Sequence, residues 1–545
     1  MSRIARVALA TALLLPSCGR NDFGVSADGL GSSTTGGSSS STGDDPSTTT
    51  EVGPVDTTTP GTTTIPPDTA TTDESTSTTG PQGCDPTPWE GDLLLDTDTE
   101  LADYPGHTSI TGNLVIYQLP TATDLAPLEC LQQVAGHVDV RNNGALERLY
   151  GLHNLESVGG YLYLLENPSL LTVADLESLR QTGDFLFIEN HPALVELWLP
   201  SLETVGGRLR VWNDPQLEVF DLPELRGSVT GIEIGLNESL FFVDGLFGLS
   251  GCTGNIEVRQ NAALIDVLGL SGISGPVGGV VVVGNPSLLE LDSLGGVTAV
   301  GGDVRIESNP SLPSVAGFAG LESIGGNLWL EGNASLAAVD GFGGVGALGG
   351  NLVVVANPQL VDMSGLGSIG SVGNFVVVED NPQLQDLDDL AGLAGFLPGG
   401  LWIDGNASLH DLDGLAGLTG VGGFVSIYDN PQLQSIDGLA GVGAVGDLVR
   451  VMFNPSLPNV DGLAGLTSVG ADLRVQSNAS LLDVDGLLAL QQVGGKMVVM
   501  DNPILQGLGG LSSLQVVGED LIIQNNDSIV SLVGLGNVTS TGGGF

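Results

Sequence analysis

Apolar residues recur along most of the chain with two superimposed spacings. In GGNLWLEGNASL, residues 325–336, they alternate, so that Leu328 and Leu330 share one side of a short β-strand and Trp329 faces the other. The whole stretch returns every 23 to 25 residues, most often every 24, as the leucines from Leu146 to Leu505 that follow each turn asparagine show. One strand per repeat, with no helical pattern between strands, predicts a coil whose strands pair in parallel with those of the next repeat.

This repeat predicts an all-β fold: a single long right-handed parallel β-solenoid of about 18 turns over residues 84–545. The glycine pair before each strand permits positive φ at a sharp corner, and the asparagine after the strand bonds local backbone. We expect these asparagines to stack as an internal amide ladder that satisfies buried backbone groups. Five of them recur at intervals of 24: Asn285, Asn309, Asn333, Asn357 and Asn381.

The repeat consensus resembles the receptor L domain. It combines single strands, glycine corners and Asn-Pro-x-Leu turns, as in GGNLWLEGNASL followed by VDGFGGV. That family is the leucine-rich-repeat-like right-handed β-helix of insulin and epidermal growth factor receptor ectodomains, and its members bind protein ligands or adhere at cell surfaces. The resemblance covers residues 110–545 and concerns architecture, without assigning functional residues. It implies a bacterial surface lipoprotein built from such repeats, since no cysteine-rich module, transmembrane helix or kinase accompanies them.

The N-terminal residues have the pattern of an export signal. Arg3 and Arg6 precede an apolar run from Val7 to Leu15 that is too short to span a bilayer. The run ends in Leu15-Pro-Ser-Cys18, which resembles the lipobox of bacterial lipoproteins, with an ordinary secretory signal as the alternative. We therefore predict a signal peptide over 1–18, lipidation at Cys18 and a location in the cell envelope, in the outer membrane by family resemblance. Residues 19–83, rich in Ser, Thr, Gly and Pro, are expected to be a disordered linker.

The net charge limits the classes of partner that this protein can bind, and the cysteines indicate where a disulfide forms. With 14 basic against 64 acidic residues the formal net charge is −50, so nucleic acid is excluded as a partner because the surface would repel its phosphates. The expected partners are a protein or glycan at the cell surface and the membrane through the lipid anchor. In an oxidising envelope Cys84 and Cys130 are expected to form a disulfide at the first turns, and Cys252 to be a small buried apolar residue.

Catalytic and cofactor motifs have simpler explanations here. Three matches to the dinucleotide-binding G-x-G-x-x-G pattern, at 344–349, 365–370 and 441–446, all fall at the same glycine corner and precede no helix. The histidines lack metal-ligand spacing, and the basic partner that a β-helix polysaccharide lyase requires is not grouped with carboxylates. We therefore predict no enzyme activity, no cofactor and no metal.

One column of acids leaves a calcium alternative open. An aspartate precedes a glycine at the same place in many turns, where capping of local backbone is the favoured interpretation and calcium binding the other. The residues are Asp244, Asp340, Asp413, Asp437, Asp461 and Asp485.

The outward positions of the strands carry an unusual share of aromatic and basic residues. Eight of the eleven basic residues after Arg20 fall there. Aromatic and arginine side chains concentrate energy at interfaces, so this face predicts non-catalytic binding or adhesion. The alternative is a structural envelope spacer in which the same residues only pair across strands. The predicted ligand-binding face comprises Tyr161, Tyr163, Phe185, Phe187, Arg210, Trp212, Arg305, Trp329, Trp402, Phe424, Tyr428, Arg450 and Arg474.

Overall fold

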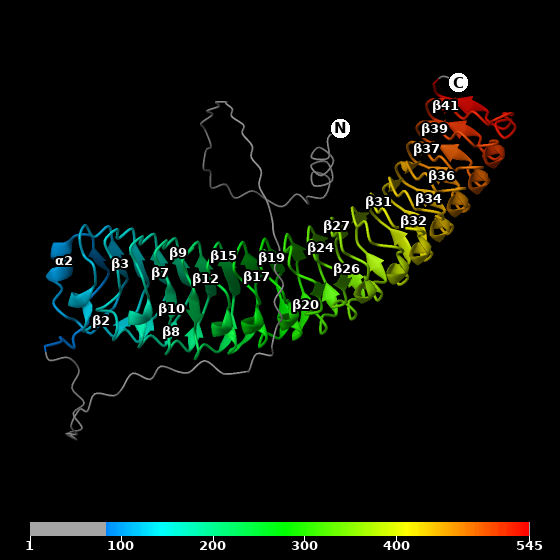
Figure 1. Cartoon of the computed structure of the whole chain (residues 1–545). Helices are drawn as coiled ribbons and strands as arrows, with labels where there is room; N and C mark the ends of the chain where they lie inside the picture. Colours follow the sequence, from blue (N-terminus) through cyan, green and yellow to red (C-terminus); the bar gives the residue numbers. More distant parts are fainter. Residues whose placement is uncertain (1–82, 544–545) are drawn as a thin grey trace, which may run out of the picture. The chain divides into compact units, whose positions relative to one another are not determined.

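The computed structural model describes residues 83–543, and these form the predicted parallel β-solenoid (Figure 1). Its main sheet has 19 strands, one per turn, each paired in parallel with the strands of the adjacent turns. The strands are β1 (Leu93–Leu95), β3 (Leu114–Tyr117), β5 (Val138–Arg141), β7 (Leu162–Leu165), β9 (Leu186–Glu189), β12 (Arg208–Trp212), β15 (Gly231–Gly235), β17 (Ile256–Arg259), β19 (Val280–Val283), β21 (Val304–Glu307), β24 (Leu328–Glu331), β27 (Leu352–Val355), β29 (Val376–Glu379), β31 (Leu401–Asp404), β33 (Val425–Tyr428), β35 (Val449–Met452), β37 (Leu473–Gln476), β39 (Met497–Met500) and β41 (Leu521–Gln524).

Shorter strands form the second side of each turn. They pair in parallel in separate small sheets of two, five or seven strands. These strands are β2 (Ser109–Ile110), β4 (Gln133–Val134), β6 (Ser157–Val158), β8 (Gln181–Thr182), β11 (Thr204–Val205), β14 (Gly227–Val229), β16 (Leu249–Cys252), β18 (Gly275–Val277), β20 (Val297–Val300), β23 (Ser323–Ile324), β26 (Ala347–Leu348), β28 (Ser371–Val372), β30 (Gly395–Leu397), β32 (Leu418–Val421), β34 (Ala444–Val445), β36 (Ser468–Val469), β38 (Gln492–Val493), β40 (Val516–Val517) and β42 (Ser540–Thr541).

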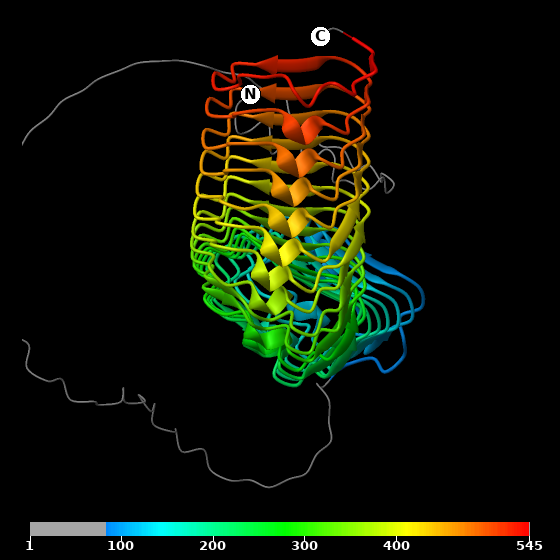
Figure 2. The same cartoon turned by 90° about the vertical axis from the view of Figure 1, so that its right-hand side faces the viewer.

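The third side consists mostly of single 3₁₀ turns, which stack in a column in the C-terminal half (Figure 2). Two strand pairs, β10 with β13 and β22 with β25, replace these turns locally. The elements of this side are η1 (Ala126–Leu128), η2 (Ala174–Leu176), β10 (Glu196–Trp198), β13 (Val219–Asp221), η3 (Asp244–Leu246), η4 (Leu268–Leu270), η5 (Asp292–Leu294), β22 (Ser314–Val315), β25 (Ala338–Val339), η6 (Ser364–Leu366), η7 (Asp388–Leu390), η8 (Asp413–Leu415), η9 (Asp437–Leu439), η10 (Asp461–Leu463), η11 (Asp485–Leu487) and η12 (Gly509–Leu511).

The core runs inside the coil as stacked columns of aliphatic side chains. Leu328 pairs in register with Leu352, and Leu330 with Val354, so the inward residues of one strand pack on those of the next. The leucine after each turn, such as Leu336, is also fully buried. No turn buries its own apolar side chains alone, which is why the repeats must stack.

The amide ladder predicted from sequence is confirmed. The backbone N–H of Asn309 donates to Oδ1 of Asn333 at 3.0 Å, and its Nδ2 donates to the carbonyl of Val282 at 2.9 Å. The same pattern runs from Asn143 to Asn526. Two rungs differ, because His191 and Asp214 stand where the repeat has asparagine, and both are fully buried.

The prediction about the glycine corner is wrong in one respect. Positive φ falls on the residue before the ladder position, as at Ser308 with φ 55°, and the glycine pairs before the strands are not in that region. The glycines serve close stacking instead: a Cβ on Gly349 would overlap the carbonyl oxygen of Gly325 in the turn below. The spacing between turns, more than backbone conformation, therefore requires glycine there.

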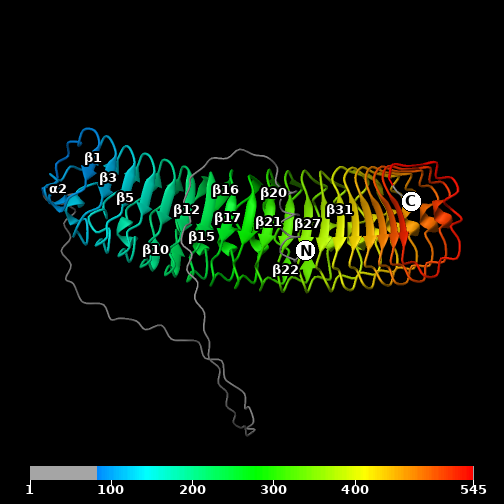
Figure 3. The same ribbon diagram turned by 90° about the horizontal axis from the view of Figure 1, so that it is seen from above.

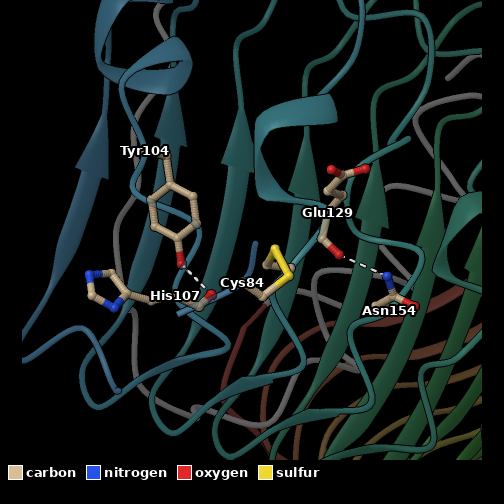
Figure 4. Close-up of a disulfide and its surroundings, with 6 residues drawn as sticks. Cys84, Tyr104, His107, Glu129 and Asn154 are labelled. Atoms are coloured by element: carbon tan, nitrogen blue, oxygen red, sulfur yellow. Dashed lines mark hydrogen bonds between the residues drawn. A yellow bond between two sulfur atoms is a disulfide. The ribbon is translucent and has the colours of Figure 1, made fainter. Parts of the chain in front are cut away.

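The first turns are closed by a short helix and a disulfide. In α2 (Asp98–Ala102) the Thr97 hydroxyl accepts from the N–H of Glu100 and caps the helix. Cys84 is bonded to Cys130, with 5.5 Å between their Cα atoms, as the sequence led us to expect (Figure 4). Beside it the Tyr104 hydroxyl donates to the carbonyl of His107 at 2.8 Å. Cys252 is buried and unbonded, as predicted, and burial raises the pKa of its thiol.

Candidate functional site

The candidate site is the outward side of the main sheet, here called the strand face, whose parallel strands are seen in Figure 3. The residue between the two inward positions of each strand lies on this face, and in-register pairing sets the order of neighbours. Arg305 pairs with Trp329, and Trp329 with Val353 in the next turn. All thirteen predicted face residues are partly exposed. They form two separated groups, one at each end of the stretch from β7 to β37.

The N-terminal group is a stack of rings along the coil. The ring centroids of His137 and Tyr161 lie 3.8 Å apart, and those of Tyr161 and Phe185 lie 4.4 Å apart, with nearly parallel planes. Phe185 in turn stacks on Phe187 at 4.1 Å, and Tyr163 meets Phe187 edge to face. Because both faces of the Tyr161 ring are covered by neighbours, this group presents ring edges rather than ring faces.

Trp212 is oriented differently from that stack. Its Cε3 and Cη2 both lie 2.7 Å from the position that a Cβ would take on Gly235, and Cζ3 between them is only slightly closer. An edge-on ring would place the two flanking carbons much farther away than the middle one, so the indole lies flat over Gly235. This arrangement needs glycine at that place in β15. The guanidinium of Arg210 lies 5.0 Å from the Trp212 ring centroid.

The C-terminal group contains Trp329 and, three turns further on, Trp402 with its neighbours. The guanidinium of Arg305 lies 5.4 Å from the Trp329 ring centroid, and the indole N–H of Trp329 donates to Glu331. Arg450 lies 4.9 Å from the centroid of Trp402 and 5.3 Å from that of Tyr428. Cation–π contact of this kind stabilises the arrangement of side chains within the face.

The structure also explains which outward residues are not accessible. Val353 and Val377 occupy the two turns between the tryptophans and are 1% and 7% exposed, because longer neighbouring side chains cover them. Phe424 meets the Trp402 ring edge to face at 5.7 Å. Trp329 and Trp402 are thus about 14 Å apart along the coil, at ~4.8 Å per turn, with a valine floor between them.

The arginines of the face are engaged with carboxylates. Arg210 lies 3.3 Å from Glu189 and 3.4 Å from Glu233. Two other face arginines pair with an acid two residues away in the chain: Arg305 with Glu307 at 2.6 Å and Arg474 with Asp472 at 2.6 Å. Burial raises the pKa of Glu189, against the opposing effect of Arg210. Charge pairing, across strands for Arg210 and between residues two apart for Arg305 and Arg474, therefore accounts for much of the segregation of basic residues seen in the sequence.

The other features proposed from sequence lie away from this face. Asp244, Asp413, Asp437, Asp461 and Asp485 begin 3₁₀ turns, and most are exposed. Within residues 83–543 no group of three or more His, Cys, Asp or Glu side chains is arranged to hold a metal ion. Cys18, the predicted lipidation site, lies outside the described residues.

Two shallow hollows also lie off the strand face. One, of about 410 Å³, is lined by corner residues that include Asn142, Glu166 and Asn190. The other, of about 280 Å³, lies over the second side, between Gln133 and Ser157. Neither brings together groups with catalytic chemistry.

A surface feature that the sequence analysis missed lies on the third side. Several turns between β7 and η5 carry a second apolar residue directly after the buried leucine of the turn, as in Leu240-Phe241 and Leu288-Leu289. Only the first of each pair is buried, and the second is exposed. The sequence did hold a signal for this surface: two apolar residues in a row at a turn where only one can face inward, so that the other must be exposed.

Comparisons with known proteins show a distant likeness in fold. No protein-family model matches the sequence, and no curated protein matches it. Among solved structures, the TLR13–ssRNA13 complex is 12% identical, with 79% of this chain and 85% of that chain covered and a TM-score of 0.18. The Leptospira interrogans LRR protein LIC12759 is also 12% identical, with 79% and 94% covered and a TM-score of 0.21. The chain is a parallel β-solenoid with distant structural similarity to leucine-rich-repeat proteins.

Proposed function

We propose that this protein is a non-catalytic binding or adhesion lipoprotein of the cell surface, built from repeats like those of the receptor L domain. The observation that carries the proposal is the pair of half-exposed aromatic groups on an open sheet face, one around Tyr161 to Trp212 and one around Trp329 to Tyr428. Aromatic and arginine side chains supply much of the binding energy of protein interfaces.

The orientation of the rings favours a protein over a glycan as the ligand. A sugar binds aromatic residues through a free ring face, and here neighbouring rings or guanidinium groups lie against the faces of Tyr161, Trp329 and Trp402. A protein surface makes equally good contacts with ring edges. Trp212 is no exception, because its indole lies flat on Gly235 and the Arg210 guanidinium lies 5.0 Å from its ring centroid.

Between Trp329 and Trp402 the valines add no contact surface, since Val353 and Val377 are 1% and 7% exposed. A partner would therefore contact the two indoles and the side chains around them. The surrounding charges are paired with one another, so a ligand need not neutralise them. This arrangement supports a docking surface in which shape and apolar contact contribute more than net charge.

The test of the face is a double substitution, Trp329→Ala with Trp402→Ala, after a cell-surface pull-down and a glycan array have identified a ligand. We expect ligand affinity to fall at least tenfold with the fold retained, as for truncated interface anchors. Phe396→Ala is the matched control, since Phe396 lies in β30 on the second side and is 62% exposed. Unchanged affinity in the double variant, with its thermal midpoint retained, would favour the structural spacer.

Membrane attachment is tested separately. The lipobox-like residues before Cys18 support a lipid anchor, and labelled palmitate should be incorporated into the wild type but not into Cys18→Ala. Incorporation that persists in the variant would reject the anchor. Protease accessibility on intact cells would then show whether the solenoid faces outward.

A further inference from the structure

The third side of the coil carries a run of exposed apolar residues over six consecutive turns. The residue four places after the ladder position is apolar in five of these turns; in the remaining one it is Glu218, and the apolar residue is its neighbour Val219, in register with Glu196. We call these residues the apolar stripe: Leu171, Val195, Val219, Phe241, Ile265 and Leu289.

Backbone hydrogen bonds hold neighbouring stripe residues one turn apart. Val195 N donates to the Leu171 carbonyl at 3.0 Å, and Val219 N to the Val195 carbonyl at 3.2 Å. Ile265 N likewise donates to the Phe241 carbonyl at 3.0 Å, and Leu289 N to that of Ile265 at 2.8 Å. The six turns are separated by five steps of ~4.8 Å, so the stripe is about 24 Å long.

The stripe is accessible although its members are large and apolar. Phe241 is 46% exposed and Leu289 is 49% exposed, and only Ile265 is half-buried. Further exposed apolar side chains widen the surface: Trp198, Phe242, Phe247 and Leu268. Trp198 is directed outward because the strand pair β10 and β13 replaces the 3₁₀ turn there. Contiguous apolar surface of this kind on a soluble protein marks an interaction site.

The unpaired charges beside the stripe have one sign. Five of its six segments, 190–203, 214–225, 237–250, 261–274 and 285–298, contain no lysine or arginine. Beside the sixth, which carries Leu171, Arg148 is paired with Asp175. The five segments do contain acids that form no ion pair among the described residues: Glu218, Asp221, Glu238, Asp244, Glu290 and Asp292. Burial and the nearby carboxylates of Asp266 and Asp221 raise the pKa of Asp244. On the strand face, by contrast, arginines already neutralise most of the acids.

We propose that the apolar stripe binds a cationic amphipathic α-helix of a partner protein. A helix of about 16 residues is ~24 Å long, the length of the stripe, and its apolar side would cover the stripe while lysines or arginines met the unpaired acids. A lipid surface with anionic headgroups is disfavoured by the same acids, and so is a second copy of this strongly acidic chain. The site is separate from the strand face and does not depend on the proposed function.

The probe is a synthetic 16-residue helical peptide with leucine along one side and lysine along the other, labelled for fluorescence anisotropy. Two control peptides carry glutamate in place of lysine or serine in place of leucine. We expect only the Leu/Lys peptide to bind the full chain, and its affinity to fall as salt is raised. Equal binding of the Leu/Glu peptide would overturn the proposal.

The decisive variant is Phe241→Ser with Leu289→Ser, which changes exposed residues only. Its matched control is Val361→Ser with Leu482→Ser, at the same repeat position but outside the stripe, where the side chains are 56% and 40% exposed. We expect the first pair to weaken peptide binding at least about tenfold and the second to leave it within about twofold. The site would be refuted if both double variants lose peptide affinity equally, or if neither loses it.

Other occupants give distinct results. If analytical sedimentation shows that the wild type is a dimer and that Phe241→Ser with Leu289→Ser is a monomer, the stripe binds a second copy of the chain. Binding to phosphatidylcholine vesicles that the same variant abolishes would assign it to lipid. Either result would overturn the helix proposal. The proposal is supported if the protein is a monomer, does not bind the vesicles, and binds the Leu/Lys peptide through these residues.

Discussion

Replacing Asp214 by asparagine restores the usual residue at the one acidic rung of the ladder, and we expect a more stable protein. In the wild type, Oδ1 of Asp214 accepts from the backbone N–H of His191 at 2.8 Å and lies 3.0 Å from its Nδ1. Oδ2 is buried and has no hydrogen-bond partner within the described chain. Asn237, one rung on, uses the corresponding Nδ2 to donate to the carbonyl of Val211 at 3.1 Å.

The size of the effect follows from that single atom. By the register of the ladder, Oδ2 of Asp214 stands where an amide would donate to Ile188, so asparagine removes an unpartnered oxygen and adds a hydrogen bond. Each change contributes roughly 1 kcal/mol, giving a gain of about 2 kcal/mol at pH 7. Both acceptor contacts of Oδ1 with His191 are retained by the amide oxygen.

The gain should depend on pH. Burial raises the pKa of Asp214, while its hydrogen bond to His191 opposes the shift. A carboxyl whose pKa is higher in the folded state stabilises the wild type most below the unfolded pKa of ~3.9, and that contribution is lost as pH rises through the folded value. The advantage of Asp214→Asn should therefore be larger at pH 7 than at pH 3.

Urea denaturation at both pH values, with amide hydrogen exchange around residues 188–237, measures the effect locally, since a solenoid need not unfold in one step. Asn261→Asp is the matched control: it places the same acid in a regular rung and should lower stability at pH 7. If Asp214→Asn is no more stable than the wild type at pH 7, the assignment of Oδ2 as an uncompensated group is refuted.

Three further predictions concern the packing of the turns. Gly462→Ala places a Cβ against the carbonyl of Ile436 and should cost ~3 kcal/mol in urea denaturation, whereas Gly507→Ala, with no atom within 4 Å of the new Cβ, should change stability by less than about 0.5 kcal/mol. Asn333→Ala leaves the carbonyl of Ile306 and one ladder N–H without their partners and should cost about 2–4 kcal/mol, seen as faster exchange in the adjacent turns. Cys84→Ser opens a link between residues 46 apart and should cost about 3–4 kcal/mol, detected by proteolysis confined to the first turns.

The fold was predictable because every repeat has the same alternation of apolar residues and the same spacing of the turn asparagine. Leu328 and Leu330 point inward where the alternation placed them, and Asn333 forms the rung that its spacing indicated. The left-handed corner was not predictable in the same way. Its residues are as different as Ser308 and Phe453, so position in the turn, and not residue type, determines that conformation.

The strand face was predictable in membership but not in geometry. Alternation places Tyr161 and Trp329 outward, yet sequence does not say that Tyr161 is stacked on both sides or that Arg305 lies against the Trp329 ring. Those contacts depend on neighbours a full turn away and on rotamers. The apolar stripe was missed for a related reason, since Phe241 beside Leu240 resembles core until the turn geometry shows which of the two faces inward.

The pairing of each strand with the next turn has a kinetic consequence. Paired residues of the main sheet are only 21 to 25 positions apart, as between Leu93 and Leu114 or Val376 and Leu401. Over a folded length of about 460 residues this gives a relative contact order on the order of 0.05, below that of helical bundles. Most parallel sheets form slowly because their strands are distant in sequence. Here any two adjacent repeats can begin the coil as they leave the ribosome, and each added turn covers the strand edge that the previous one exposed.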